Sequence, residues 1–175
     1  MKNLVVVIAF LMASTVSFAQ GAFDKFEDKE GVASVVVNKK MFEMMSKVKV
    51  DAKDKETQQY MNLLKKLDNL KVFTTSNTKI SSDMKATVNS YLKSNPLEEL
   101  MRVNGDGKNV KIYVKSGANE NIVRELLMFI EGSNMKDAGT VVLSLTGNFS
   151  LDEISMLTEK ISLPGGDDLK KASKK

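Results

Sequence analysis

The chain contains no histidine, no cysteine and no tryptophan, and only two of its 175 residues are proline. Without an imidazole or a thiol, neither a Ser-His-Asp triad nor a Cys-His pair can be assembled. Zinc sites built from histidine and cysteine are excluded for the same reason, and so are disulfides. Any catalysis would therefore depend on carboxylates, lysine, tyrosine or serine, and the fold must be held together by packing.

The first 19 residues have the pattern of a secretory signal peptide. Lys2 supplies the positive charge, and Leu4–Met12 is an apolar segment shorter than the roughly 20 residues that a spanning helix needs. The small residues Ser17 and Ala19, which follow this segment, predict cleavage between Ala19 and Gln20. No cysteine follows, so we expect an exported protein, periplasmic or secreted, that is not a lipoprotein and has no transmembrane segment in its mature chain.

The net charge of +4 gives little support to nucleic-acid binding. Four lysines and two aspartates follow the break at Pro164, so much of the positive charge lies in a short C-terminal tail. A nucleic-acid-binding domain would instead carry a basic face with interleaved aromatic residues on its body. We therefore expect no nucleic-acid partner, and interpret residues 164–175 as a flexible basic tail.

Alternating strand and helix patterns fill the first half of the remaining sequence. Val32–Val37 is a continuous apolar run, which predicts a central strand covered on both faces. Asn38 is placed to cap the helix that follows. A second helix is expected over Thr57–Asn69, after a charged loop, and a second strand over Leu70–Thr75. A strand, a helical connection and a strand predict a parallel pair.

The pattern then changes to consecutive strands. A helix capped by Ser81 or Ser82 is expected to end at an Asn-Pro step. Glu99–Val103 and Asn109–Lys115 flank an Asn-Gly-Asp-Gly-Lys sequence, which predicts a hairpin. Ile122–Glu131 fits either a helix or a doubly covered strand, and the glycines on both sides favour the strand.

The last elements form a strand, a turn and a helix. Thr140–Thr146 is a β-branched, apolar run that Gly147 and Asn148 interrupt. Ser150 and Glu153 then have the spacing of a capping box, in which the Ser150 hydroxyl accepts from the Glu153 N–H and the Glu153 carboxylate accepts from the Ser150 N–H. The apolar positions of the expected helix are Leu151, Ile154, Leu157 and Ile161.

Together these elements predict a single α+β domain over residues 20–163. Its mixed β-sheet would be parallel in the N-terminal β-α-β unit and antiparallel in a C-terminal meander, with helices mainly on one face. The domain would be preceded by the signal peptide, residues 1–19, and followed by the tail.

Two groups of residues suggest sites. Asn104 opens a sequence similar to a calcium loop, but its twelfth position is Lys115 where calcium requires a bidentate glutamate, so we interpret it as a turn. Met41, Met44 and Met45 lie close together after the first strand. Methionine usually fills cores, and a partner-binding apolar face is the alternative interpretation of these three.

Paired carboxylates occur at Glu98-Glu99 and Asp152-Glu153. Neighbouring side chains on a strand or helix point apart, so neither pair forms an acid–base couple by itself. No catalytic, cofactor-binding or metal-ligating residue is assigned, and no cofactor is expected.

Several segments resemble an exported family of Bacteroidota catalogued as a domain of unknown function, number 4252. They are a Phe-Ala-Gln signal end, Met41-Phe42, Glu99–Val103, Val110–Tyr113, Glu125–Met128 and Leu145–Ile154. The resemblance implies an envelope location and an association with sigma-factor-linked stress loci. It implies no activity and transfers no functional residues.

These observations favour a non-catalytic binding or interaction module of the bacterial envelope, with an envelope protein or a hydrophobic ligand as its partner. A hydrolase that uses carboxylates or lysine is the alternative. Calcium-dependent adhesion is a third interpretation, which requires calcium to raise the melting temperature.

Overall fold

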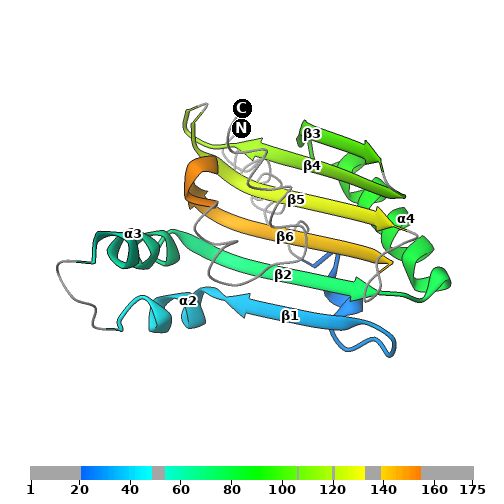
Figure 1. Ribbon diagram of the computed structural model, residues 1–175, viewed down its shortest axis with the longest axis horizontal. Helices are drawn as coiled ribbons and strands as arrows, with labels where there is room; N and C mark the ends of the chain where they lie inside the picture. The colour runs from blue at the N-terminus through cyan, green and yellow to red at the C-terminus, as the bar shows by residue number, and fades with distance from the viewer. Residues whose placement is uncertain (1–20, 49–53, 106, 120, 133–138, 155–175) are drawn as a thin grey trace, which may run out of the picture.

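The computed structural model describes residues 21–48, 54–105, 107–119, 121–132 and 139–154. Six strands form one open sheet in the order β1-β2-β6-β5-β4-β3 (Figure 1). The strands are β1 (Ala33–Asn38), β2 (Leu67–Thr75), β3 (Glu98–Gly105), β4 (Lys108–Ser116), β5 (Val123–Gly132) and β6 (Thr140–Phe149). The helices are the 3-10 turn η1 (Asp24–Phe26), α2 (Lys39–Met45), α3 (Lys55–Leu64) and α4 (Thr78–Ser94). The predicted α+β class is confirmed, whereas the signal peptide, Gln20 and the tail lie outside the described residues.

Every pair of neighbouring strands is antiparallel. The C-terminal meander is confirmed, but the parallel β-α-β unit, and with it the mixed sheet, is wrong. Ala33 lies opposite Thr74 and Asn38 opposite Asn69 in the β1–β2 pair. The reason is that α2 and α3 lie beyond the end of the sheet where β1 finishes, and do not cross its face (Figure 1). A chain that re-enters a sheet from the end at which it left must run antiparallel.

The first strand lies at an edge of the sheet, so the prediction of a central, doubly covered strand is also wrong. β1 has a neighbour on one side only, because β6 occupies the other side of β2. The buried centre is formed by β5 and β6, where Leu126–Ile130 and Val141–Leu143 are buried throughout. A run of valines can form a central strand or an edge strand. Which of the two it forms depends on the order of the strands in the sheet.

Two helix caps follow from asparagine. Asn38 caps α2 as predicted, with its Oδ1 accepting from the Met41 N–H at 3.0 Å. The N-cap of α4 is Asn77, whose Oδ1 accepts two backbone N–H bonds, and neither Ser81 nor Ser82. This helix starts earlier than predicted because β2 ends only two residues before its cap.

Other boundaries differ by a few residues. The prediction of a strand over 122–131 is confirmed by β5, and the predicted hairpin joins β3 to β4. α3 begins at Lys55 and ends at Leu64, so the expected helix over Thr57–Asn69 starts too late and runs too far, and Leu67 already belongs to β2. β6 continues to Phe149 through the residues that were expected to stop it.

The predicted capping box is present after β6. The Glu153 N–H donates to Ser150 Oγ at 3.4 Å, and the Ser150 N–H donates to Glu153 Oε2 at 2.9 Å. Residues 151–154 are helical, while Leu157 and Ile161 lie outside the described residues.

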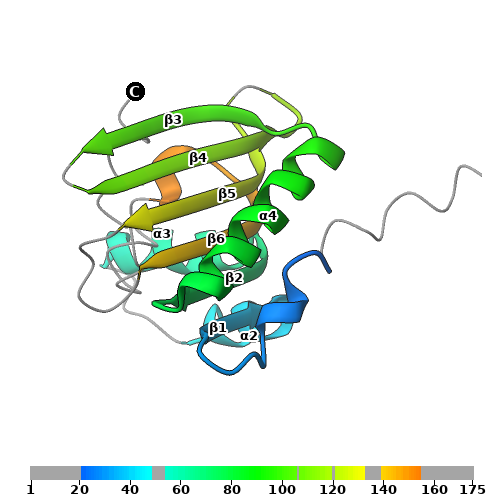
Figure 2. The same ribbon diagram turned by 90° about the vertical axis from the view of Figure 1, so that its right-hand side faces the viewer.

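The two faces of the sheet pack against different helices. One core, the α2–α3 core, includes Phe42, Leu63, Leu64, Leu70, Val72, Leu126, Met128, Val141, Leu143 and Leu145. The other, the α4 core, joins η1 and α4 to the opposite face (Figure 2) and comprises Phe23, Phe26, Phe73, Ile80, Met84, Val88, Tyr91, Leu127, Phe129 and Val142. In the described residues η1 and α4 cover one face, whereas α2 and α3 lie beyond the end of the sheet and contribute side chains such as Phe42 and Leu63 to the core on the other face. The expected arrangement, with helices mainly on one face, therefore holds for η1 and α4.

Candidate interaction surface

The large hydrophobic side chains that are exposed in the described part of the chain all come from one segment, residues 35–48. Their exposed fractions range from 43% for Val36 to 60% for Val48. Together they form the β1–α2 apolar edge, which consists of Val35, Val36, Met41, Met44 and Val48. Single exposed hydrophobic residues are ordinary, whereas several of them on one short segment, here on both faces of an edge strand and on the helix after it, are typical of an interaction site.

Helical spacing places the three C-terminal members of this edge on one side of α2. Met41, Met44 and Val48 follow at intervals of three and four residues, and backbone bonds from Ser46 onward extend the helical turn past its last residue. Phe42 points the other way and is fully buried in the α2–α3 core. A buried anchor therefore fixes the helix while its outer side remains apolar.

The methionines predicted as a partner-binding face are divided by the structure. Met41 and Met44 are 51% and 58% exposed, whereas Met45 is half-buried against the α2–α3 core. Val35 and Val36 were not predicted as part of the surface, because an apolar strand was expected to be central. No sequence signal separates the two cases, since exposure depends on strand order.

The two edges of the sheet differ in their protection against pairing with another chain. β3 carries Glu98, Glu99 and Arg102, and its pairing with β4 shifts register at residues 99–101. Charges and bulges of this kind prevent edge-to-edge association. β1 has the sequence Ala-Ser-Val-Val-Val-Asn, without charge, proline or register shift. Its outer edge is therefore competent to pair with a further strand.

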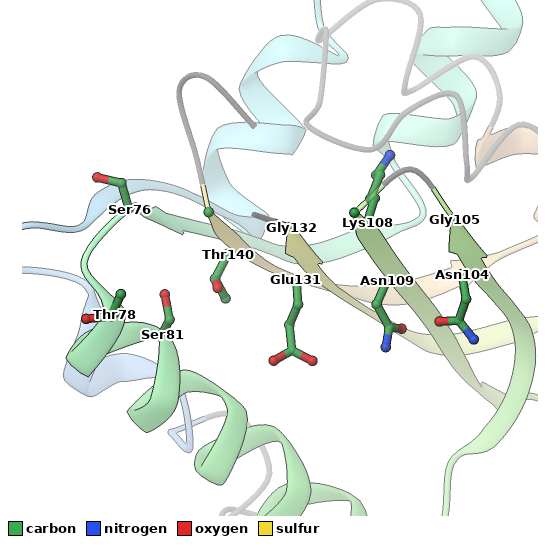
Figure 3. Close-up of a pocket in the computed structure, with 12 residues that line it drawn as sticks. Ser76, Thr78, Ser81, Asn104, Gly105, Lys108, Asn109, Glu131, Gly132 and Thr140 are labelled. Atoms are coloured by element: carbon green, nitrogen blue, oxygen red, sulfur yellow. The ribbon is translucent and has the colours of Figure 1, made fainter. Parts of the chain in front are cut away.

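A polar hollow of about 920 Å³ opens where the ends of β3 and β5 and the starts of β4 and β6 face the start of α4 (Figure 3). Its described lining is mainly serine, threonine, asparagine and glycine, with Glu131 as the sole carboxylate. Glu131 accepts from Lys85 at 2.9 Å. The described lining therefore lacks the second carboxylate that a two-carboxylate hydrolase needs. Residues 106 and 133–138, which adjoin the lining, lie outside the described part, and we assign the hollow no function.

Charged groups that a hydrolase would use are engaged in structural contacts. Arg102 donates two hydrogen bonds to Glu99, at 2.9 and 2.6 Å, and lowers the pKa of that carboxyl. Burial disfavours the charge of Lys71, but its bonds to Asp24 and Glu27 prevail and raise its pKa. A general acid needs a raised pKa and a catalytic lysine a lowered one, so Glu99 is unsuited to the first role and Lys71 to the second.

A buried tyrosine–carboxyl pair ties α4 to β5. The Tyr91 hydroxyl donates to Glu125 Oε1 at 2.5 Å, and both residues are buried. Burial raises the pKa of Tyr91 far above its ordinary value, and the adjoining Glu125 raises it further. The phenol therefore stays protonated and serves as a permanent donor within the α4 core.

The described residues offer no metal cluster and no membrane span. In the ranges that the structure covers, no cluster of three or more His, Cys, Asp or Glu side chains is placed to hold a metal ion. Lys115 is exposed on β4, and Asp106 of the calcium-like turn lies outside these ranges. No helix of the described part is both long enough and apolar enough to cross a membrane.

Fold and surface together define a small α+β domain with an open antiparallel sheet, one protected edge and one apolar edge. The chain belongs to the family described as "Domain of unknown function (DUF4252)", whose sequence profile matches residues 26–157. The match extends over the β1–α2 apolar edge. Comparisons with curated proteins and with solved structures found no similar protein.

Proposed function

We propose that this domain is an exported, non-catalytic interaction module of the bacterial envelope, which binds a protein partner through the β1–α2 apolar edge. The observation that carries the proposal is the gathering of the exposed large hydrophobic side chains on residues 35–48. Export rests on the signal-like pattern of the first 19 residues, and the envelope role on the family resemblance.

The chemistry of this surface favours a protein over a small hydrophobic ligand. An edge strand offers backbone N–H and C=O groups that an extended chain satisfies by adding a strand. Exposed methionines beside it provide flexible, polarisable contacts that adapt to a partner's side chains. A small-molecule site would instead be concave and would enclose most of its ligand.

Site-specific photocrosslinking in the native cells tests the binding surface. A photoreactive amino acid at Val35 or Met44 is expected to give a discrete adduct on irradiation. The matched control is Asn89, an exposed residue on α4. Adducts at Asn89 that equal those at Val35, or no adduct at either edge position, would refute the binding surface.

The export step has its own test. Cell fractionation followed by mass spectrometry of the purified chain should find it outside the cytoplasm with Gln20 as its first residue. A cytoplasmic chain that keeps residues 1–19 would exclude an envelope role and leave the binding surface to be judged separately.

A further inference from the structure

We propose that the partner of the β1–α2 apolar edge is a second copy of this chain, and that the β1 strands of the two copies pair antiparallel about a two-fold axis. This inference rests on the proposed function, because it assigns an occupant to the same surface. The result would be one sheet continuous across both copies.

The charges at the two ends of β1 favour this arrangement. Asp28 and Glu30 lie exposed before the strand, with Lys29 between them bound to Asp83, and Lys39 and Lys40 lie exposed after it. Lys39 also contacts Asp68 at 2.9 Å but remains on the surface. Antiparallel copies bring the acidic flank of each to the basic flank of the other. A parallel arrangement would instead place like charges together, which is unfavourable.

The side-chain directions of β1 limit the register. Val35 lies opposite Val72, a residue of the α2–α3 core, whereas Val36 lies opposite Lys71, on the face of the α4 core. Residues opposite each other in an antiparallel pair share a face. A two-fold axis perpendicular to the sheet places the α4-core face of one copy beside the α4-core face of the other. Because alternate residues of a strand share a face, Val36 must lie opposite Ser34, Val36 or Asn38 of the second copy. Of the registers that this condition allows, we choose the one with Val36 opposite Val36, because Val35 then meets Val37 and three valines face three valines.

α2 extends the contact beyond the strand. It packs on the α2–α3 core through Phe42, directly after the strand that would be paired. Met41 and Met44 then lie at the end of β1, beside the start of the other copy's strand. In this arrangement the exposed strand and the exposed methionines face the same neighbour.

Opposite charges introduced at the two-fold axis test the inference. Val36→Lys and Val36→Glu are each expected to weaken self-association at least tenfold, because each places two like charges opposite one another. A mixture of the two variants should recover a heterodimer, because the charges are then opposite. Sedimentation velocity of the chain from Gln20 to Lys175 measures both effects over a range of concentrations. Circular dichroism verifies folding, which is expected since Val36 is 43% exposed.

The outcomes separate this inference from the proposed function. Dimers that weaken with either variant and recover in the mixture support β1 pairing. Dimers that are indifferent to the charge at Val36 overturn it. A chain that stays monomeric, while a photoreactive group at Val35 captures a different protein, overturns self-pairing and leaves the proposed function standing. A monomer without any adduct at Val35 or Met44 overturns both.

Discussion

The backbone N–H of Asn148 donates to the carbonyl oxygen of Lys66 at 2.8 Å and joins the end of β6 to the turn before β2. Gly147 passes this turn so closely that a Cβ would lie 2.4 Å from the same oxygen and 3.0 Å from Leu67 Cα. Both neighbours are backbone atoms and cannot move without disturbing the strand pairing. Gly147→Ala is therefore expected to lower the free energy of unfolding by about 1–3 kcal/mol, measured by urea denaturation.

Gly105 provides the matched control. It lies at the end of β3, and a Cβ there would meet nothing within 4 Å. Gly105→Ala should change the free energy of unfolding by less than about 0.5 kcal/mol. Equal effects of the two substitutions would show that close approach is not the reason for glycine at position 147.

The Tyr91–Glu125 pair predicts a second effect on stability. Tyr91→Phe removes the donor from a buried carboxyl group while keeping the ring, so it should lower the free energy of unfolding by about 1–3 kcal/mol. Combining it with Glu125→Gln should cost less than the sum of the two single substitutions, because the partners are then lost together. Strict additivity in urea denaturation would contradict the coupling.

Glu153 makes stability depend on pH in the acid range. Burial by itself raises the pKa of this carboxyl, but bonds from Lys66 and from the Ser150 N–H lower it more, so its pKa falls below the ordinary 4.5. The stability it contributes is therefore fully present above pH 4.5 and is lost as the pH falls through the lower folded-state pKa. The difference in unfolding free energy between the wild type and Glu153→Gln should be constant from pH 7 to 5.5 and shrink in more acid solution. A pH-independent difference would refute this role.

The two sides of α2 should respond differently to truncation. Phe42 is fully buried in the α2–α3 core, so Phe42→Ala is expected to lower the free energy of unfolding by about 3–5 kcal/mol. Met44 is 58% exposed, so Met44→Ala should stay within about 0.5 kcal/mol. Chemical denaturation of both variants tests the division, and a large loss at Met44 would mean that this side chain serves the core.

Local signals in the sequence predicted local structure well. The Asn38 cap, the Ser150–Glu153 capping box and the hairpin between β3 and β4 depend on residues within a few positions of one another. The prediction of Ser81 or Ser82 as the cap of α4 was wrong because serine and asparagine are both good N-cap residues. Asn77 takes this role because it follows the end of β2 at Thr75. Gly147 was interpreted as a strand breaker, although its role is to let the strand pass another backbone.

The arrangement of strands could not be predicted in the same way. The direction of β2 depends on two short helices lying beyond the end of the sheet, and the position of β1 depends on β6, more than 100 residues later, taking the place beside β2. The extent of the β1–α2 apolar edge could not be predicted for the same reason. The sequence allows Met41 and Met44 to be interpreted as a partner-binding face. The exposure of Val35 and Val36 cannot be predicted without knowing the order of the strands.

Methionine oxidation tests the central claim, that the β1–α2 apolar edge is covered by a protein in the cell. Exposed methionines oxidise to the sulfoxide faster than buried ones, and mass spectrometry measures each rate. In the dilute purified chain, Met41 and Met44 should oxidise quickly, while the buried Met84 and Met128 resist. In intact cells Met41 and Met44 should oxidise markedly more slowly than in the purified chain. Each rate is divided by that of Met84 in the same sample, and equal ratios in cells and in the purified chain would show that the edge is unoccupied and would contradict the account.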